Sequence, residues 1–141
     1  MYTLDSNILI YAADEDFPLH STALTIRNKA LKETDEVRLC YPVLLEFFAV
    51  ITDPKRVRNP LPPREAWDQV KAYLDAFTVL YPDEATFAKL DELVCIYRIR
   101  RQDIFDALIV ALMLQYGVKG IYTANARDFA RFREIEVLPW P

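Results

Sequence analysis

Short apolar runs alternate with longer stretches of helical periodicity along this chain, and that alternation restricts its fold more than any other feature. Five short runs are expected to be strands, at about residues 2–5, 37–41, 78–81, 121–123 and 135–138. The stretches between them carry apolar residues at helical spacing and are expected to be helices, at about 7–13, 19–33, 42–52, 63–77, 83–99, 103–116 and 126–132. Strands separated by helices favour an α/β fold in layers around a largely parallel sheet.

The chain has the size of one domain. Its 141 residues are enough to bury a core, and no internal repeat or low-complexity tract divides them, so we expect a single domain over 1–141. The segment 54–63 is the one long loop, with four prolines and three basic residues. The net charge of −4 argues against a protein that coats nucleic acid without regard to sequence.

The cysteines and the N-terminus indicate the compartment. Cys40 and Cys95 lie in apolar stretches without the spacing of a metal site, and we expect both to be buried thiols of a reducing compartment. The N-terminus does not show the pattern of a signal peptide, and the longest apolar run, 107–114, is too short to span a bilayer. We therefore expect a soluble, cytoplasmic protein that has no membrane partner.

Four acidic residues interrupt apolar stretches of the sequence. Asp5 follows the first predicted strand, Glu46 lies within the apolar segment 41–51, and Asp103 and Asp106 precede the apolar run 107–114. A buried carboxylate costs several kcal/mol unless a cation or strong donors compensate it. We therefore expect these side chains to meet in the fold and to share a positive partner, for which a divalent metal ion is the simplest choice.

The predicted topology gives these acids a place to meet. Sites in open α/β sheets form at the carboxyl ends of the strands, where Asp5 ends the first strand. Glu46 and Asp106 each lie one turn into a helix, where free backbone N–H groups help to hold an anion. Three further polar residues follow the fourth strand: Thr123, Asn125 and Asp128. These residues are expected to converge on one edge of the sheet.

An all-oxygen ligand set favours Mg²⁺, with Mn²⁺ as an alternative. Such an ion can orient a water and neutralise a phosphoryl oxygen, which suits phosphodiester hydrolysis. Zinc is disfavoured because His20 is the only histidine. The sequence contains neither the serine-nucleophile motif GxSxG nor the nucleotide-binding loops GxGxxG and GxxxxGK[ST].

Each acid also has a purely structural interpretation. Asp5 and Asp103 could cap the helices that follow them, although Ser6 is our expected cap for the first helix. Glu46 could pair with a buried arginine, and Asp106 could have a structural role of its own. Asp128 could be a surface residue beside Arg127 and Arg131. The joint pattern, rather than any one residue, supports a metal site.

The order of four motifs resembles that of PIN-domain nucleases. Asp5-Ser6-Asn7 after a short strand is similar to the first motif of this family, and the segment 41–47 with its single glutamate is similar to the second. Asp103 to Ala111 resembles the third motif, in which the aspartate before Ala-Leu-Ile is a metal ligand. The segment 121–129 resembles the fourth. The resemblance covers nearly the whole chain and implies a three-layer α/β/α fold with a central, mainly parallel sheet.

Within that family, the size of the chain is most similar to VapC-type toxins of toxin–antitoxin pairs. The resemblance implies a Mg²⁺-dependent endoribonuclease with an RNA substrate, a homodimer, and a VapB-type antitoxin whose tail occupies the active-site groove. It implies that Asp5 and Asp106 hold the metal, that Glu46 completes the acidic set, and that Asn7 and Thr123 support it. Arginines at 54–58 and 98–101 are candidates for holding flanking phosphates.

The chain departs from the family pattern at one position. Many relatives have an aspartate where this chain has Asn125, so that Asp128 or the neutral oxygen of Asn125 must fill the fourth site position, and Asp103 could compensate. Whether one or two metal ions bind stays open at this point. Two alternatives to the toxin also remain: a PIN-type DNase or RNA-processing nuclease, and a non-enzymatic module that binds an arginine-rich peptide.

Overall fold

The computed structural model describes all residues, 1–141, and contains every strand and helix expected from the sequence. The strands are β1 (Tyr2–Leu4), β2 (Arg38–Cys40), β3 (Thr78–Leu80), β4 (Gly120–Tyr122) and β5 (Glu136–Val137). The helices are α1 (Ser6–Ala13), α2 (His20–Lys32), α3 (Tyr41–Ile51), α4 (Pro63–Ala76), α5 (Glu84–Tyr97), α6 (Asp103–Tyr116) and α7 (Ala126–Ala130). A short 3-10 helix at Thr34–Glu36 was not expected from the sequence.

All strand pairs are parallel. β1, β4 and β5 form one ladder and β2 and β3 another, and a single parallel bridge between Tyr2 and Val37 joins the two. The strand order is therefore β3-β2-β1-β4-β5. The chain builds outward from β1 through β2 to β3 and then crosses to β4 on the opposite side. This reversal makes the gap between the carboxyl ends of β1 and β4 the switch point, where sites of open α/β sheets form.

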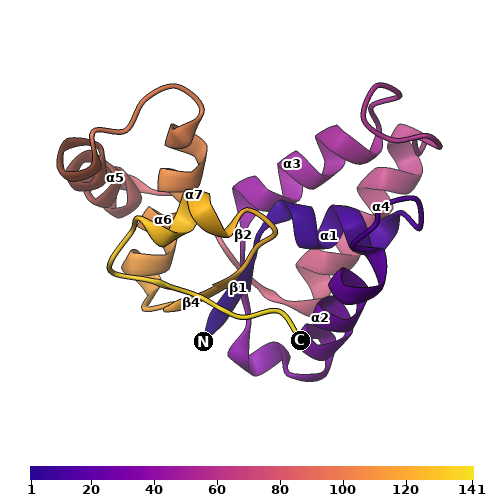
Figure 1. Ribbon diagram of the computed structural model, residues 1–141, viewed down its shortest axis with the longest axis horizontal. Helices are drawn as coiled ribbons and strands as arrows, with labels where there is room; N and C mark the ends of the chain where they lie inside the picture. The colour runs from indigo at the N-terminus through magenta and orange to yellow at the C-terminus, as the bar shows by residue number, and fades with distance from the viewer.

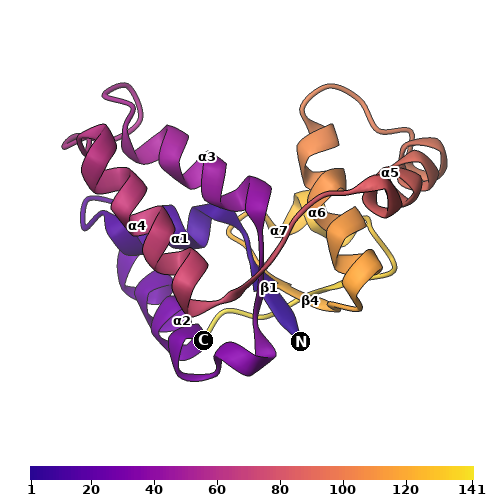
Figure 2. The same ribbon diagram turned by 180° about the vertical axis from the view of Figure 1, so that it is seen from behind.

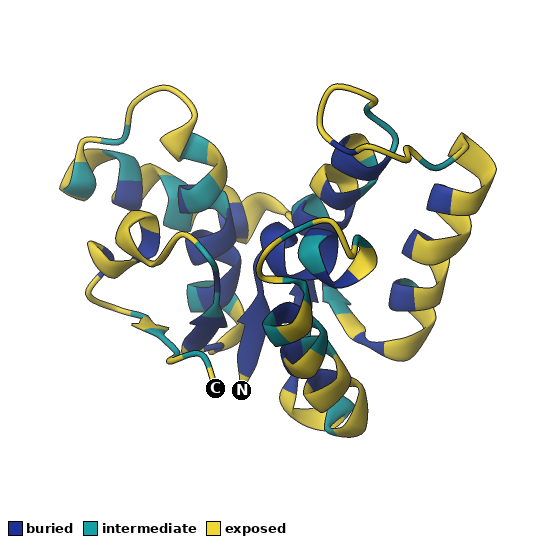
Figure 3. Ribbon diagram, turned by 45° about the vertical axis from the view of Figure 1, so that its right-hand side comes forward, coloured by how far each residue is buried: buried dark blue, intermediate teal, exposed yellow.

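The helices form two layers around this sheet. Helices α1 to α4 lie on one side and α5 to α7 on the other, as the front and back views both show (Figure 1, Figure 2). Figure 3 shows that the buried residues follow the strands and the inner faces of the helices. The largest fully buried side chains include Phe47, Phe129 and Phe132. The predicted three-layer α/β/α fold with a parallel sheet is confirmed.

Local chemistry explains where several helices begin and end. Prolines occupy the first turns of α3 and α4, where a missing N–H costs nothing. Asp83 caps α5 by accepting from the backbone of Ala85 and Thr86, and the Thr86 hydroxyl in turn binds the Asp83 N–H. Gly117 ends α6 with φ of 70°, a left-handed conformation that glycine adopts without strain.

Two expectations about single residues were wrong. The cap of α1 is Asp5 rather than Ser6, because Ser6 is already helical and donates its N–H to Asp5 Oδ1. Cys95 is exposed on α5, whereas Cys40 is buried as expected. None of the helices combines the length and apolar character that crossing a membrane requires.

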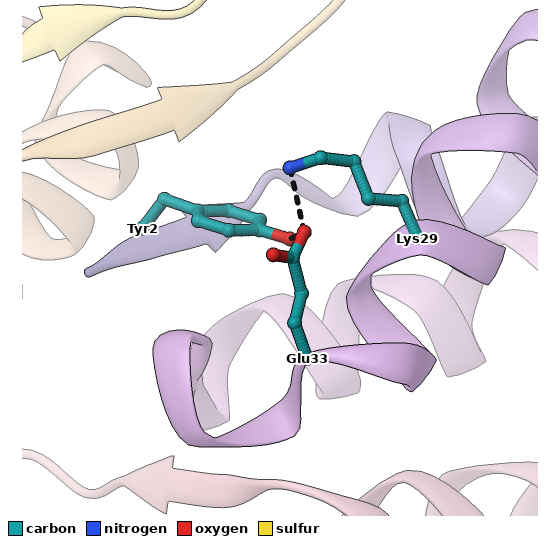
Figure 4. Close-up of polar contacts among 3 residues, drawn as sticks. All are labelled: Tyr2, Lys29 and Glu33. Atoms are coloured by element: carbon teal, nitrogen blue, oxygen red, sulfur yellow. Dashed lines mark hydrogen bonds and ion pairs between the residues drawn. The ribbon is translucent and has the colours of Figure 1, made fainter.

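A polar cluster ties β1 to α2 (Figure 4). The Tyr2 hydroxyl donates to Glu33 Oε1 over 2.9 Å, and the Lys29 ammonium lies 2.6 Å from the same carboxylate. Lys29 also sits 4.7 Å from the centre of the Tyr2 ring and 5.7 Å from that of Tyr122. Burial and the Glu33 carboxylate raise the pKa of Tyr2 to about 12, so its hydroxyl stays a donor. The cluster therefore fastens α2 to two central strands.

We expect Tyr2→Phe to lower the free energy of unfolding by about 1 kcal/mol, because a hydrogen bond to a charged acceptor is lost while the ring stays packed. Urea unfolding followed by circular dichroism measures this change. Tyr81→Phe is the matched control, since the Tyr81 hydroxyl makes no hydrogen bond and its side chain is exposed. Equal stability of the two variants would contradict the proposed role of the cluster.

Candidate active site

Asp5 lies at the centre of the candidate site, at the switch point of the sheet. Its backbone N–H donates to the Tyr122 carbonyl over 2.9 Å and continues the pairing of β1 with β4. The residue then leaves the sheet and caps α1 through Oδ1. Its side chain is only 5% exposed. The capping interpretation and the site interpretation of Asp5 are thus compatible, because one carboxylate oxygen caps the helix and the second belongs to a polar network.

Asn7 and Thr123 build that network around Asp5 Oδ2. The Thr123 hydroxyl donates to Oδ2 over 2.7 Å, and the Asn7 side-chain amide donates to Oδ2 and to Thr123 Oγ1. The side-chain oxygen Oδ1 of Asn7 accepts from the N–H of Ala124, and Thr123 Oγ1 accepts from the N–H of Asn125. Residues more than 110 positions apart in the sequence are thereby held in one arrangement. The loop after β4 is fixed against the end of β1.

The three acids that the first three motifs single out face one cavity of about 180 Å³. Asp5, Glu46 and Asp106 all line it, together with Asn125 and Arg56. Asn7 also contributes, and the apolar part of the wall comes from α1, α3 and the turn that follows α1. Side chains from β1, α3, α6 and the loop after β4 therefore meet as the topology predicts. The cavity combines three carboxylates with a single guanidinium.

Asp106 is half-buried in the first turn of α6. Its pKa is raised to about 7, first by burial and then by the negative charges of Asp5, Asp128, Asp103 and Glu46. The pKa of Asp5 is also raised, mainly by burial, although hydrogen bonds from Thr123, Ser6 and Asn7 oppose the rise. Four other carboxylates thus disfavour the ionised form of Asp106, one of them from its own helix. Such a group is stable as anions only when a cation joins it.

The environment of the outer acids differs from the expectation. Glu46 and Asp103 are exposed, whereas Asp5 is buried and Asp106 is half-buried. Glu46 makes no ion pair, and the N-cap of α6 is Gln102 rather than Asp103. The structural roles considered for Glu46 and Asp103 are therefore not the ones they have. Asp103 instead lies 3.4 Å from Arg131 on the surface. Asp128 is exposed on α7 and does not line the cavity, whereas Asn125 does.

The donor chemistry of the cavity fits a hard divalent cation. All its candidate ligands are oxygen atoms, as Mg²⁺ prefers. Oδ2 of Asp5 already accepts two hydrogen bonds, whereas Oδ1 accepts one and keeps a lone pair for a metal. No three acidic, histidine or cysteine side chains are close enough together to enclose an ion. This arrangement suits Mg²⁺, which is usually held by one or two carboxylates and keeps several waters.

Two features of the site were not singled out by the sequence. Tyr11 and Phe17 line the cavity beside the acids, and their rings contact each other with centres 4.7 Å apart. Trp140, next to the end of the chain, donates its indole N–H to the Thr123 carbonyl over 2.9 Å. A tryptophan between two prolines carries no local signal of such a contact. Only the pairing of β5 with β4 brings it there.

Comparison with known proteins agrees with this geometry. The family model described as the PIN domain matches residues 2–135. Ribonuclease VapC24 of Mycobacterium tuberculosis is 28% identical over 133 residues, which cover 94% of this chain and 91% of that protein. Ribonuclease VapC48 of the same organism is 28% identical over 140 residues, which cover 96% of this chain and 94% of that protein.

Solved structures show the same fold. The crystal structure of VapC20 from M. tuberculosis, described as a toxin that cleaves the sarcin–ricin loop, superposes with a TM-score of 0.71 at 18% identity. The superposition covers 99% of this chain and 100% of the VapC20 chain. A chain of the crystal structure of VapBC2 from Rickettsia felis, bound to a DNA fragment from their promoter, superposes with a TM-score of 0.69 at 16% identity. The match covers 99% of this chain and 98% of that chain. At these identities, the likeness establishes the fold alone.

The raised pKa of Asp106 predicts an effect of pH on stability. An aspartate whose folded-state pKa is raised destabilises the fold as the pH rises from its ordinary pKa, 3.8, to about 7. We expect Asp106→Asn to stabilise the metal-free protein by about 1 to 2 kcal/mol at about pH 8, a value that allows for solvent screening. Near pH 4 the variant and the parent should be equally stable. Urea unfolding at both pH values is the measurement.

Asp75→Asn serves as the control for this experiment, because Asp75 is an exposed aspartate on α4. Its effect should be small at both pH values. A gain for Asp106→Asn that is the same in acid and in alkaline buffer would show that charge repulsion in the cavity is not its cause.

Proposed function

This chain belongs to the PIN-domain family, and from that premise we propose that it is a Mg²⁺-dependent endoribonuclease that acts as the toxin of a type II toxin–antitoxin pair. One observation carries the proposal: Asp5, Glu46 and Asp106 line one cavity at the switch point of a parallel sheet. The names of the relatives support the substrate, because both M. tuberculosis proteins described above are called ribonucleases.

The residues of the cavity take distinct roles in this proposal. Asp5 and Asp106 hold the metal directly. Glu46 would complete the acidic set, together with Asp103 or Asp128 at the outer edge, and Asn125 would supply a neutral oxygen. Asn7 and Thr123 fix the orientation of the Asp5 carboxylate. When bound, Mg²⁺ orients a water for attack on phosphorus and neutralises charge on the phosphoryl oxygen.

Arg56 gives the cavity a cation for the substrate. It lies in the loop after α3, where its N–H and that of Val57 both bind the Asp53 carbonyl. Val57 is buried, so the loop is anchored beside the cavity. The Arg56 guanidinium forms no ion pair within 4 Å, although it shares the cavity wall with three carboxylates. A free guanidinium suits a phosphate oxygen of RNA next to the cleaved bond.

The partner in this proposal is a VapB-type antitoxin. The structural neighbours include DNA-bound VapBC complexes from Rickettsia felis and Salmonella typhimurium, and a structure from Klebsiella pneumoniae that is described as a toxin–antitoxin complex. The acidic cavity is suited to a cationic side chain from such a partner, because a guanidinium would offset both the burial and the carboxylate repulsion that raise the pKa of Asp106. An antitoxin tail of this kind would occupy the place of the metal and its substrate.

A homodimer is the proposed assembly. A groove of about 530 Å³ between α3 and α6 is lined mainly by apolar side chains and includes Leu45, Phe105 and Leu108. Phe105 and Leu45 are among the exposed large apolar residues, at 63% and 42% exposure. Clustered exposed apolar side chains mark interaction surfaces. Glu46 also lines this groove, so the surface adjoins the acidic cavity.

We expect Asp5→Asn to reduce RNA cleavage in Mg²⁺ by about 100-fold or more, because a direct metal ligand loses its charge. The fold should remain intact, since asparagine caps helices as well as aspartate does. Cleavage of total RNA followed by sequencing of the new ends measures activity, and circular dichroism checks the fold. Asp75→Asn is the matched control and should cleave at the parent rate.

The same assay distinguishes the alternatives. Asp5→Asn with parent activity would remove the proposed metal site from the mechanism. Cleavage of DNA but not RNA would indicate a PIN-type DNase. Absence of Mn²⁺ or Mg²⁺ binding by calorimetry, with tight binding of an arginine-rich peptide, would indicate a non-enzymatic module instead.

We expect Phe105→Glu to convert the dimer to a monomer, because a charge would be buried at the proposed interface. Size-exclusion chromatography with light scattering measures the mass. The control is Phe87→Glu on α5, whose side chain is 72% exposed outside the groove and should leave the mass unchanged. A Phe105→Glu protein with the parent mass would rule out this groove as the interface.

A further inference from the structure

The C-terminal segment runs along the central strands to the candidate site. β5 pairs with β4 in parallel, and the Leu138 N–H continues the ladder by donating to the Ile121 carbonyl over 2.9 Å. The Leu138 side chain packs over Gly120, where a Cβ atom would lie 2.9 Å from Leu138 Cδ1. A side chain at position 120 would therefore displace the Leu138 side chain. Two residues later, Trp140 lies level with the loop that follows β4.

The indole of Trp140 supplies a hydrogen bond that the backbone does not. Thr123 is 2% exposed, and its carbonyl accepts from Trp140 Nε1 over 2.9 Å. No backbone N–H donates to this carbonyl. A buried carbonyl without a donor is unfavourable, so the loop would shift if the indole N–H were removed. The carbonyl of Thr123 is therefore held from one side by Trp140.

The side-chain hydroxyl of Thr123 is held by residues of the candidate site. Thr123 Oγ1 donates to Asp5 and accepts from Asn7 and from the Asn125 N–H, so all its hydrogen-bonding capacity is used. A shift of the Thr123 backbone would therefore break bonds at Asp5 as well. The half-buried indole is linked to the buried carboxylate through one residue.

We propose that Trp140 is a positioning residue, which holds Thr123 so that its hydroxyl orients the Asp5 carboxylate. The inference for metal binding rests on the proposed function of Asp5, whereas the inference for the loop does not. Trp140 does not line the cavity, and the one hydrogen bond of its side chain goes to Thr123. The penultimate residue of this sequence thereby belongs to the support of the site.

Amide hydrogen exchange of the full-length, metal-free protein tests whether Trp140 holds the loop after β4. Trp140→Phe keeps an aromatic ring and removes the N–H donor. We expect the amides of Ala124 and Asn125 to exchange about fivefold faster, because their acceptors on Asn7 and Thr123 move. The amides of Ala85 and Thr86 are the internal reference, since they are held by Asp83 at a distant helix cap. Their rates should not change.

Trp67→Phe is the matched variant. Trp67 is 37% exposed on α4, contacts Phe48 with its ring, and donates no hydrogen bond through its indole. It should leave all four amides unchanged. Unaltered exchange at Ala124 and Asn125 in Trp140→Phe would overturn the proposal. So would equal acceleration at Ala85 and Thr86, because that result indicates a general loss of stability.

Calorimetric titration with Mn²⁺ tests whether the position of Thr123 affects metal binding by Asp5. We expect Trp140→Phe to weaken Mn²⁺ binding about fivefold relative to the parent and to Trp67→Phe, because supporting groups of a metal ligand affect affinity. Parent-like affinity in Trp140→Phe, despite faster exchange of the loop, would overturn the link from Thr123 to Asp5. If the parent itself binds no Mn²⁺, the proposed function fails, and the exchange experiment still decides the role of Trp140.

Discussion

The hydrogen bond from the Asp5 N–H to the Tyr122 carbonyl brings the carboxyl ends of β1 and β4 to the same level. Parallel strands that end together place their following residues side by side, although these strands are more than 110 residues apart in the chain. Asp5 and Thr123 therefore come within 2.7 Å of each other. The helices on both sides add Glu46 and Asp106 at this edge. The candidate site depends on this register, because a slip of the pairing would separate Asp5 from Thr123.

The electrostatics of this edge work against the stability of the protein. Burial and four neighbouring carboxylates raise the pKa of Asp106 to about 7, and burial raises that of Asp5. A core built only for stability would not gather these groups. The stabilisation comes from elsewhere, including the contiguous apolar core and the cluster of Tyr2, Lys29 and Glu33. Unfavourable charge at one site, supported by a rigid frame, is typical of functional sites.

The sequence predicts the elements well because local rules decide them. Helical spacing, prolines in first turns and Gly117 at the end of α6 act over a few residues, so they can be read directly. The convergence of Asp5, Glu46 and Asp106 also follows from the sequence, since strand ends of a parallel sheet share one edge. Exposure is less predictable. An apolar neighbourhood in the sequence suggested burial for Glu46, Asp103 and Cys95, yet each faces solvent on a helix.

The sequence by itself determined the order of strands and helices and the acidic residues that meet at their ends, because periodicity and position at an element's end are local properties. Only the tertiary structure decided how those residues are supported. Arg56 faces the acids because Val57 anchors its loop, and Trp140 reaches Thr123 because β5 pairs with β4. Such contacts join residues through the packing of separate elements. No spacing along the chain encodes them.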